Sequence, residues 1–149
     1  MAAARPKYNT ASRNRYTSAH ENSTGPGDAR PTALQIVEYE GLIGKLSDKV
    51  FVVTGVSSGI GVETMRALYA TGGRVFGTAR NLAKGQKAVD EIKSTTKGGE
   101  ITLIEIDQDS LASVRKGAEE ILKQTETINV LVNNAGFEHS PDFKQRSSS

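Results

Sequence analysis

A run of glycines and hydroxyl residues gives the sequence its clearest chemical signal. The stretch TGVSSGIG places Gly55, Gly59 and Gly61 directly after an apolar run. If a strand ends and a helix begins here, the unpaired backbone N–H groups and the helix dipole favour a phosphate or pyrophosphate group. The glycines let that anion approach the main chain, and the hydroxyls of Ser57 and Ser58 can add donors. The sequence has no G-x-x-x-x-G-K-[ST], which excludes a P-loop. The alternative is a glycine-rich turn that holds no ligand.

The elements that must position this loop are predicted from residue 49 onward, where apolar runs alternate with helical segments. We expect strands at 50–54, 74–78, 101–106 and 128–133, and helices at about 60–72, 81–94 and 110–125. The last helix is expected to pack through Leu111, Val114, Ala118, Ile121 and Leu122. Short runs rich in β-branched residues fit strands buried on both faces. The alternation predicts an α/β fold with a parallel, doubly wound sheet.

Composition narrows the class of protein. Nineteen basic against seventeen acidic residues give a net charge of +2, which is too balanced to favour nucleic acid or an anionic membrane surface as a partner. The absence of cysteine removes disulfides and thiolate chemistry, and the two histidines have no metal-ligand spacing. No apolar run is long enough for a membrane span, and no secretory h-region is present. We therefore expect a soluble cytoplasmic protein, with a mitochondrial location as the alternative because the first residues are basic.

The organisation of the chain changes along its length. Residues 1–30 are polar and lack large aliphatic side chains, which predicts a disordered tail. Residues 31–48 predict a lead-in helix and linker, with a proline where a first helical turn tolerates it. Residues 49–136 form the predicted α/β domain, and residues 137–149 a polar C-terminal tail.

A second motif identifies a family. TGVSSGIG and the later NNAG, with strands and helices between them, resemble the signatures TGxxxGIG and NNAG of the short-chain dehydrogenase/reductase family. The resemblance covers residues 44–136 and is strongest to the retinol-dehydrogenase-like and fungal oxidoreductase branches. It implies a Rossmann fold that binds a nicotinamide dinucleotide, and it disfavours a methyltransferase-like Rossmann domain. The implied pyrophosphate contacts are Gly55, Ser57, Ser58, Gly59, Ile60 and Gly61.

The end of the second predicted strand bears on the choice of cofactor. A carboxylate there would accept a hydrogen bond from the ribose 2′-hydroxyl of NAD, whereas an arginine would accommodate the 2′-phosphate of NADP. The sequence has Arg80 at this position and no acid until Asp90. We therefore expect NADP rather than NAD. The alternative is that Arg80 is a solvated residue at the start of a helix.

Other cofactor contacts are implied by the resemblance. Asp107, with Gln108 beside it, matches the family's acidic residue near the adenine. The alternative role for Asp107 is capping the following helix, and Asp109 or Ser110 could cap it equally well. The NNAG segment implies that Asn134, Ala135 and Gly136 form a wall of the cofactor site. For Asn133, hydrogen bonding to buried backbone groups of the sheet and contact with the ligand are both open.

The catalytic residues that the family uses have no match. The resemblance implies a serine and a Tyr-x-x-x-Lys pair after NNAG. The four tyrosines, Tyr8, Tyr16, Tyr39 and Tyr69, all precede that motif, and none has lysine four residues later. We therefore expect no general acid/base chemistry from this chain as it stands.

Two functions of different class follow from these observations. The first is the dinucleotide-binding part of an NADP-dependent oxidoreductase that acts on alcohol or carbonyl substrates, inactive as written. The second is a non-catalytic module. With the expected strand order 3-2-1-4, the strand at 128–133 leaves an open sheet edge that could pair with another chain or with a second copy.

Overall fold

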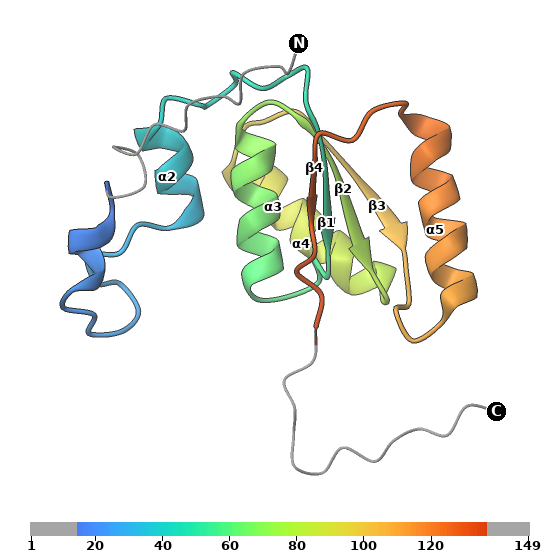
Figure 1. Cartoon of the computed structure of the whole chain (residues 1–149), viewed down its shortest axis with the longest axis horizontal. Helices are drawn as coiled ribbons and strands as arrows, with labels where there is room; N and C mark the ends of the chain where they lie inside the picture. Colours follow the sequence, from blue (N-terminus) through green and yellow to red (C-terminus); the bar gives the residue numbers. More distant parts are fainter. Residues whose placement is uncertain (1–14, 137–149) are drawn as a thin grey trace, which may run out of the picture.

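The structure, a computed structural model, describes residues 15–136 and contains one parallel sheet (Figure 1). Its four strands have the order β3-β2-β1-β4, and the alternation of strands and helices confirms the predicted α/β Rossmann-like fold. The elements are η1 (Thr17–His20), α2 (Ala33–Tyr39), β1 (Val50–Thr54), α3 (Ile60–Ala70), β2 (Arg74–Ala79), α4 (Leu82–Thr95), β3 (Glu100–Glu105), α5 (Leu111–Gln124) and β4 (Val130–Val132). The predicted tail at 137–149 lies outside the described residues.

The sheet is covered on both faces, so each strand buries side chains in two directions. Helices α3 and α4 pack on one face, and α5 packs on the other (Figure 1). The first layer is Phe51, Val53, Val56, Met65, Tyr69, Val75, Val89, Ile92 and Ile101. The second, smaller layer is Val52, Phe76, Ile104 and Ile121. This two-sided burial explains why the strands are continuous apolar runs.

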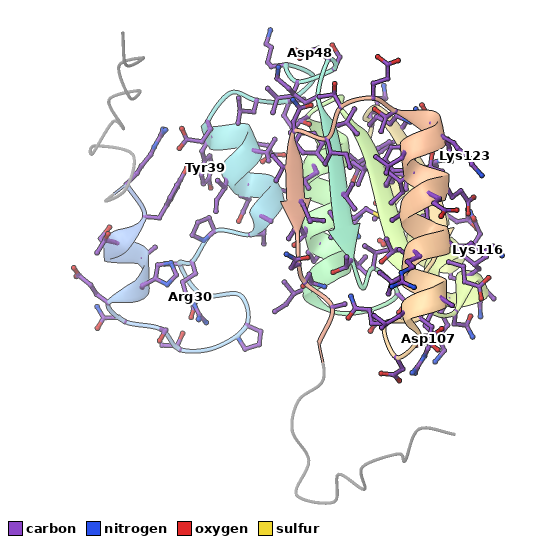
Figure 2. All side chains as sticks on the ribbon, turned by 45° about the vertical axis from the view of Figure 1, so that its right-hand side comes forward. Arg30, Tyr39, Asp48, Asp107, Lys116 and Lys123 are labelled. Atoms are coloured by element: carbon purple, nitrogen blue, oxygen red, sulfur yellow. The ribbon has the colours of Figure 1, made fainter. Side chains whose placement is uncertain are left out.

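Helix α5 contacts the sheet through a stripe that matches the predicted one only in part, since Ile121 is buried as expected. Leu111 and Leu122, expected in the packed face, are 72% and 63% exposed, whereas Gly117 and Ile121 are buried. A Cβ at Gly117 would overlap the side chain of Ile106, so this glycine lets the helix lie close to the sheet. Lys116 and Lys123 also point away from the sheet (Figure 2).

Strand β4 is shorter than predicted and forms an edge. It covers Val130–Val132 because the chain turns at Asn134, whose N–H donates to the carbonyl oxygen of Val132 (3.0 Å). It pairs with β1, and within residues 15–136 no strand pairs with its other side. Val130 and Leu131 are 43% and 56% exposed. The outer edge of β4 is therefore open in the described part of the chain.

Part of the segment expected to be disordered has local order. Within residues 15–30, the carboxylate of Asp28 accepts a hydrogen bond from Nε of Arg30 (2.8 Å), and this bond holds the pKa of Asp28 well below its ordinary value. The hydroxyl of Tyr16 donates to Oε1 of Glu40 (2.7 Å), just after α2. Composition did not indicate these contacts, because they are polar pairs at exposed positions, and the Tyr16–Glu40 bond also joins residues far apart in sequence.

Helix α2 connects this segment to the domain. It begins with a capping box in which the Thr32 hydroxyl and the Gln35 side chain bond each other's backbone N–H groups. It packs against α3, and the following chain donates from Gly44 to the Ala70 carbonyl oxygen (3.0 Å). None of the helices in residues 15–136 has the length and apolar composition needed to cross a membrane.

Candidate functional site

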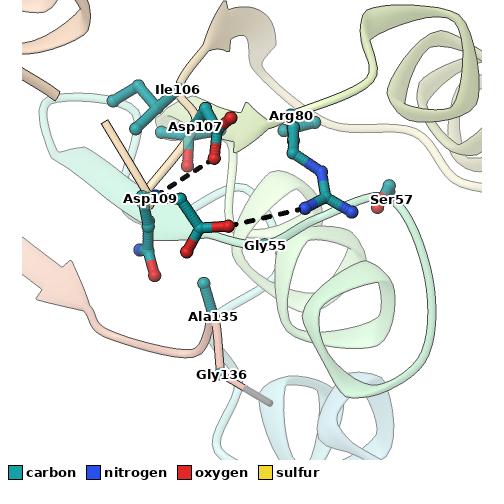
Figure 3. Close-up of a pocket in the computed structure, with 11 residues that line it drawn as sticks. Gly55, Ser57, Arg80, Ile106, Asp107, Asp109, Ala135 and Gly136 are labelled. Carbon is teal, nitrogen blue, oxygen red and sulfur yellow. Dashed lines mark hydrogen bonds and ion pairs between the residues drawn. The ribbon is translucent and has the colours of Figure 1, made fainter. Parts of the chain in front are cut away.

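An open pocket lies at the carboxyl edge of the sheet, where all four strands end (Figure 3). In parallel sheets this edge collects the loops that join strands to helices, so residues distant in sequence meet there. The lining residues are Gly55, Ser57, Thr78, Ala79, Arg80, Ile106, Asp107, Gln108, Asp109, Ala135 and Gly136.

The loop after β1 has a backbone that only glycines allow. Gly55 has φ +72°, and a Cβ there would lie 2.9 Å from Cα and Cβ of Ala135. Gly59 combines φ +64° with ψ −142°, a region that side-chain-bearing residues avoid. A Cβ on Gly61 would overlap the carbonyl oxygen of Gly55. The three glycines therefore fold the loop tightly against the start of α3.

The N-terminus of α3 has no side-chain cap, in contrast to the other α-helices. Its N-cap residue is Gly59, which has no side chain to accept from the first N–H groups. Helices α2, α4 and α5 are capped by Thr32, Asn81 and Ser110. The first N–H groups of a helix have no partner within it and carry partial positive charge. This end of α3 can therefore receive an anion.

The start of the NNAG segment is tied to the glycine loop. The side-chain amide of Asn134 donates to the carbonyl oxygens of Thr54 (3.0 Å) and Gly55 (3.1 Å). The hydroxyl oxygen of Thr54 accepts from the N–H groups of Asn134 and Ala135 (3.1 and 3.0 Å). The role of bonding buried backbone, considered for Asn133, therefore belongs to Asn134, while Asn133 is exposed. The tie holds Ala135 against Gly55 in the pocket wall.

The ends of β2 and β3 bring opposite charges together. Nη1 of Arg80 lies 3.9 Å from Oδ2 of Asp109 (Figure 3). The carboxylate of Asp107 accepts from the N–H of Asp109 (3.1 Å). Of the residues considered as caps for α5, Ser110 takes the role by accepting from the N–H of Ser113 (3.2 Å). Asp107 is thus free of the capping role and lines the pocket.

The predicted site residues divide into two groups. Those that line the pocket are Gly55, Ser57, Arg80, Asp107, Gln108, Ala135 and Gly136. Those outside its lining are Ser58, Gly59, Ile60, Gly61 and Asn134. Gly59 is the N-cap of α3, and Ile60 and Gly61 are its first residues. Asn134 supports the loop through its hydrogen bond to the carbonyl oxygen of Gly55.

Sequence reasoning missed several lining residues. Thr78 and Ala79 precede Arg80 at the end of β2, and Ile106 precedes Asp107. The rule that parallel strands gather their carboxyl ends would have indicated all of them. Asp109 was considered only as a helix cap, since its approach to Arg80 depends on the geometry of two separate loops.

Comparison with known proteins identifies the fold and its relatives. The family model for short chain dehydrogenases matches residues 49–149. The chain is 48% identical over 130 residues to the short-chain dehydrogenase/reductase prx1 of Penicillium roqueforti, covering 87% of this chain and 37% of that protein. It is 37% identical over 100 residues to human retinol dehydrogenase 12, covering 67% of this chain and 32% of that protein. The chain thus spans about a third of the length of these curated relatives.

A solved structure supports the same relationship. A metagenomic short-chain oxidoreductase in complex with NADP aligns with a TM-score of 0.55 and 37% identity, over 60% of this chain and 39% of that one. The relatives confirm the predicted likeness to fungal oxidoreductases and retinol dehydrogenases. With the glycine loop, NNAG and the matching sheet, the chain belongs to the short-chain dehydrogenase/reductase family.

Proposed function

We propose that this chain supplies the NADP-binding part of an oxidoreductase that acts on alcohol or carbonyl substrates. The observation that carries the proposal is the combination of an uncapped α3 N-terminus with Arg80 at the same edge of the sheet. An anion-accepting helix end and a guanidinium match the pyrophosphate and the 2′-phosphate of NADP. The solved relative that holds NADP supports this assignment.

Each part of the pocket has a role in holding the dinucleotide. The N–H groups at the start of α3 and the hydroxyl of Ser57 donate to the pyrophosphate. Arg80 binds the 2′-phosphate through charge-assisted hydrogen bonds. Asp107 and Gln108, at the end of β3, face the adenine, and Ala135 closes the opposite wall. NADP, when bound, provides the hydride chemistry, and this chain binds and orients it.

The same proposal assigns binding without hydride transfer to the 149-residue chain. None of its tyrosines has lysine four residues later. Without a tyrosine whose pKa a nearby lysine lowers, the chain lacks the residue pair that the family resemblance implies for proton exchange with the substrate oxygen. Purified chain mixed with NADPH and a panel of aldehydes and ketones should cause no oxidation of NADPH above the buffer rate. Steady turnover would refute this part of the proposal.

Calorimetric titration with NADP and with NAD tests cofactor binding. Saturable binding with NADP preferred is expected, and Arg80→Ala should weaken NADP binding by roughly tenfold to a hundredfold because a charge-assisted contact is lost. The NAD affinity should change much less. Arg115→Ala, an exposed arginine on α5 outside the pocket, is the matched control and should bind as the unaltered chain does. A folded chain that binds neither dinucleotide would overturn the proposal.

The open edge of β4 favours a second candidate, a non-catalytic module that pairs with another chain or with itself. Val130 and Leu131 are half exposed there, and unpaired strand edges are templates for pairing. Light scattering of the purified chain across a concentration series tests self-association. Under this candidate, Leu131→Lys should return an associating chain to monomer. A chain that stays monomeric at all concentrations would rule out pairing of the chain with itself.

The location of the protein stays a prediction. The cytoplasm is proposed, with mitochondria as the alternative. Fractionation of cells that express the tagged chain would distinguish the two compartments.

A further inference from the structure

Arg80, the proposed partner of the 2′-phosphate, has Asp109 as an acidic neighbour. Oδ2 of Asp109 lies 3.9 Å from Nη1 of Arg80, and both residues line the pocket (Figure 3). The two side chains are 61% and 64% exposed, so water solvates the pair and its members can separate easily. The backbone of Asp109 is fixed, because its N–H donates to Oδ1 of Asp107 (3.1 Å). The Asp109 carboxylate therefore starts from a tethered backbone and stays within reach of Arg80, the group proposed to recognise the phosphate.

We propose that Asp109 sets how strongly the site discriminates NADP from NAD, by opposing Arg80. This inference rests on the proposed function. The Asp109 carboxylate already lies beside the Arg80 guanidinium. A phosphate that binds Arg80 must therefore displace this carboxylate or lie close to it, and the two negative charges repel. Asp109 therefore weakens the binding of a ribose that carries a 2′-phosphate.

A ribose without the 2′-phosphate interacts with Asp109 in a different way. A 2′-hydroxyl is neutral and can donate a hydrogen bond, and an ionised carboxylate is an acceptor. Asp109 therefore supports NAD while it opposes NADP, and Arg80 has the reverse effect. The pocket carries both determinants of cofactor choice, on two loops that meet at the carboxyl ends of β2 and β3. Asp109 is thus a specificity-determining residue of the site.

Two small ligands isolate this end of the cofactor. Adenosine 2′,5′-bisphosphate carries the 2′-phosphate, and 5′-AMP lacks it. Calorimetric titrations would measure the affinity of each ligand for the full 149-residue chain, both unaltered and with Asp109→Asn. We expect Asp109→Asn to tighten the bisphosphate by about three- to tenfold at low salt and to weaken 5′-AMP by about twofold. The gain for the bisphosphate should shrink as salt is raised, because the charges are exposed.

A matched variant separates this local effect from a change in net charge. Glu119→Gln removes one negative charge from an exposed position on α5, outside the pocket, and should leave the ratio of the two affinities unchanged. If the unaltered chain binds both ligands and Asp109→Asn leaves their ratio unchanged, the inference is wrong and the proposed function stands. If a chain shown to be folded by circular dichroism binds NADP but neither small ligand, the inference is wrong; if it binds neither dinucleotide, the proposed function is wrong as well.

Discussion

The N-terminus of α3 and those of α4 and α5 lie at the same edge of one sheet, yet they are built differently. Helices α4 and α5 begin at Asn81 and Ser110, whose side-chain oxygens accept from the N–H groups of Lys84 and Ser113. Helix α3 begins after Gly59, which has no side chain to offer. The strands that precede the three helices are adjacent in the sheet. The difference lies in the residues at the ends of the three loops, which are Gly59, Asn81 and Ser110.

Under the proposed function, this difference separates the helix end that accepts an anion from the helix ends that serve stability. A side-chain cap typically stabilises a helix by about 1 kcal/mol, so a helix without one forgoes stability. At α3 the loop also requires Gly55 and Gly59 at positive φ. Such a loop gives open access to backbone N–H groups, and α4 and α5 close that access with their own side chains. The capped ends hold the fold together, and the uncapped end is available for binding.

The largest expected effect comes from closing the space behind the uncapped end. In Gly61→Ala, the added Cβ would overlap the carbonyl oxygen of Gly55, and it would lie 2.6 Å from Nδ2 of Asn134. Because backbone must move to relieve this overlap, we expect a loss of about 2–4 kcal/mol in the free energy of unfolding. Urea unfolding followed by circular dichroism measures it. A loss below about 0.5 kcal/mol, the size typical of surface substitutions, would show that the loop is not tightly packed there.

Two substitutions at Gly59 distinguish the cost of backbone strain from the effect of a negative charge on NADP binding. A Cβ at Gly59 would meet no atom within 4 Å, so Gly59→Ala carries only the strain of positive φ, about 1–3 kcal/mol. Gly59→Asp carries the same strain and adds a carboxylate where the proposed pyrophosphate binds. We expect its NADP affinity to fall at least about tenfold below that of Gly59→Ala, because like charges repel across a short distance. Calorimetry on the two folded variants makes the comparison, and equal affinities would contradict an anion site at α3.

The sequence was sufficient for most of the fold and for part of the site. The strands and helices follow from apolar periods, and the glycine loop and Arg80 from their positions after β1 and β2. The packed stripe of α5 was predicted only in part: Ile121 is buried as expected, whereas the contact that Gly117 allows with Ile106 could not be inferred from periodicity. The finding that Asn134 rather than Asn133 bonds the backbone depends on where the chain turns after β4. Local patterns determine elements, whereas contacts between loops require the assembled structure.

Removing the side-chain cap of α4 tests whether a capped helix end serves stability rather than binding. In Asn81→Ala, the N–H of Lys84 loses its side-chain acceptor, so we expect a loss of about 1 kcal/mol in the free energy of unfolding. Asn81 is outside the pocket lining, so the affinity for NADP should stay within about twofold, the range expected when no contact is lost. Urea unfolding and calorimetry on the same preparation measure both quantities. A large loss of affinity without a loss of stability would assign Asn81 to binding instead.

The most local effect is expected in hydrogen exchange at the three helix ends. Without ligand, the first-turn amides of α3 should exchange faster than the capped amides of Lys84 and Ser113, because no side chain accepts their hydrogens. NADP at about ten times its dissociation constant should slow the α3 amides by roughly tenfold, since exchange then requires the ligand to leave. The amides of Lys84 and Ser113 already have acceptors, so their local opening should slow much less. Equal slowing at all three helix ends would mean that NADP stabilises the domain without contacting α3, and the uncapped end would then have no special part in binding.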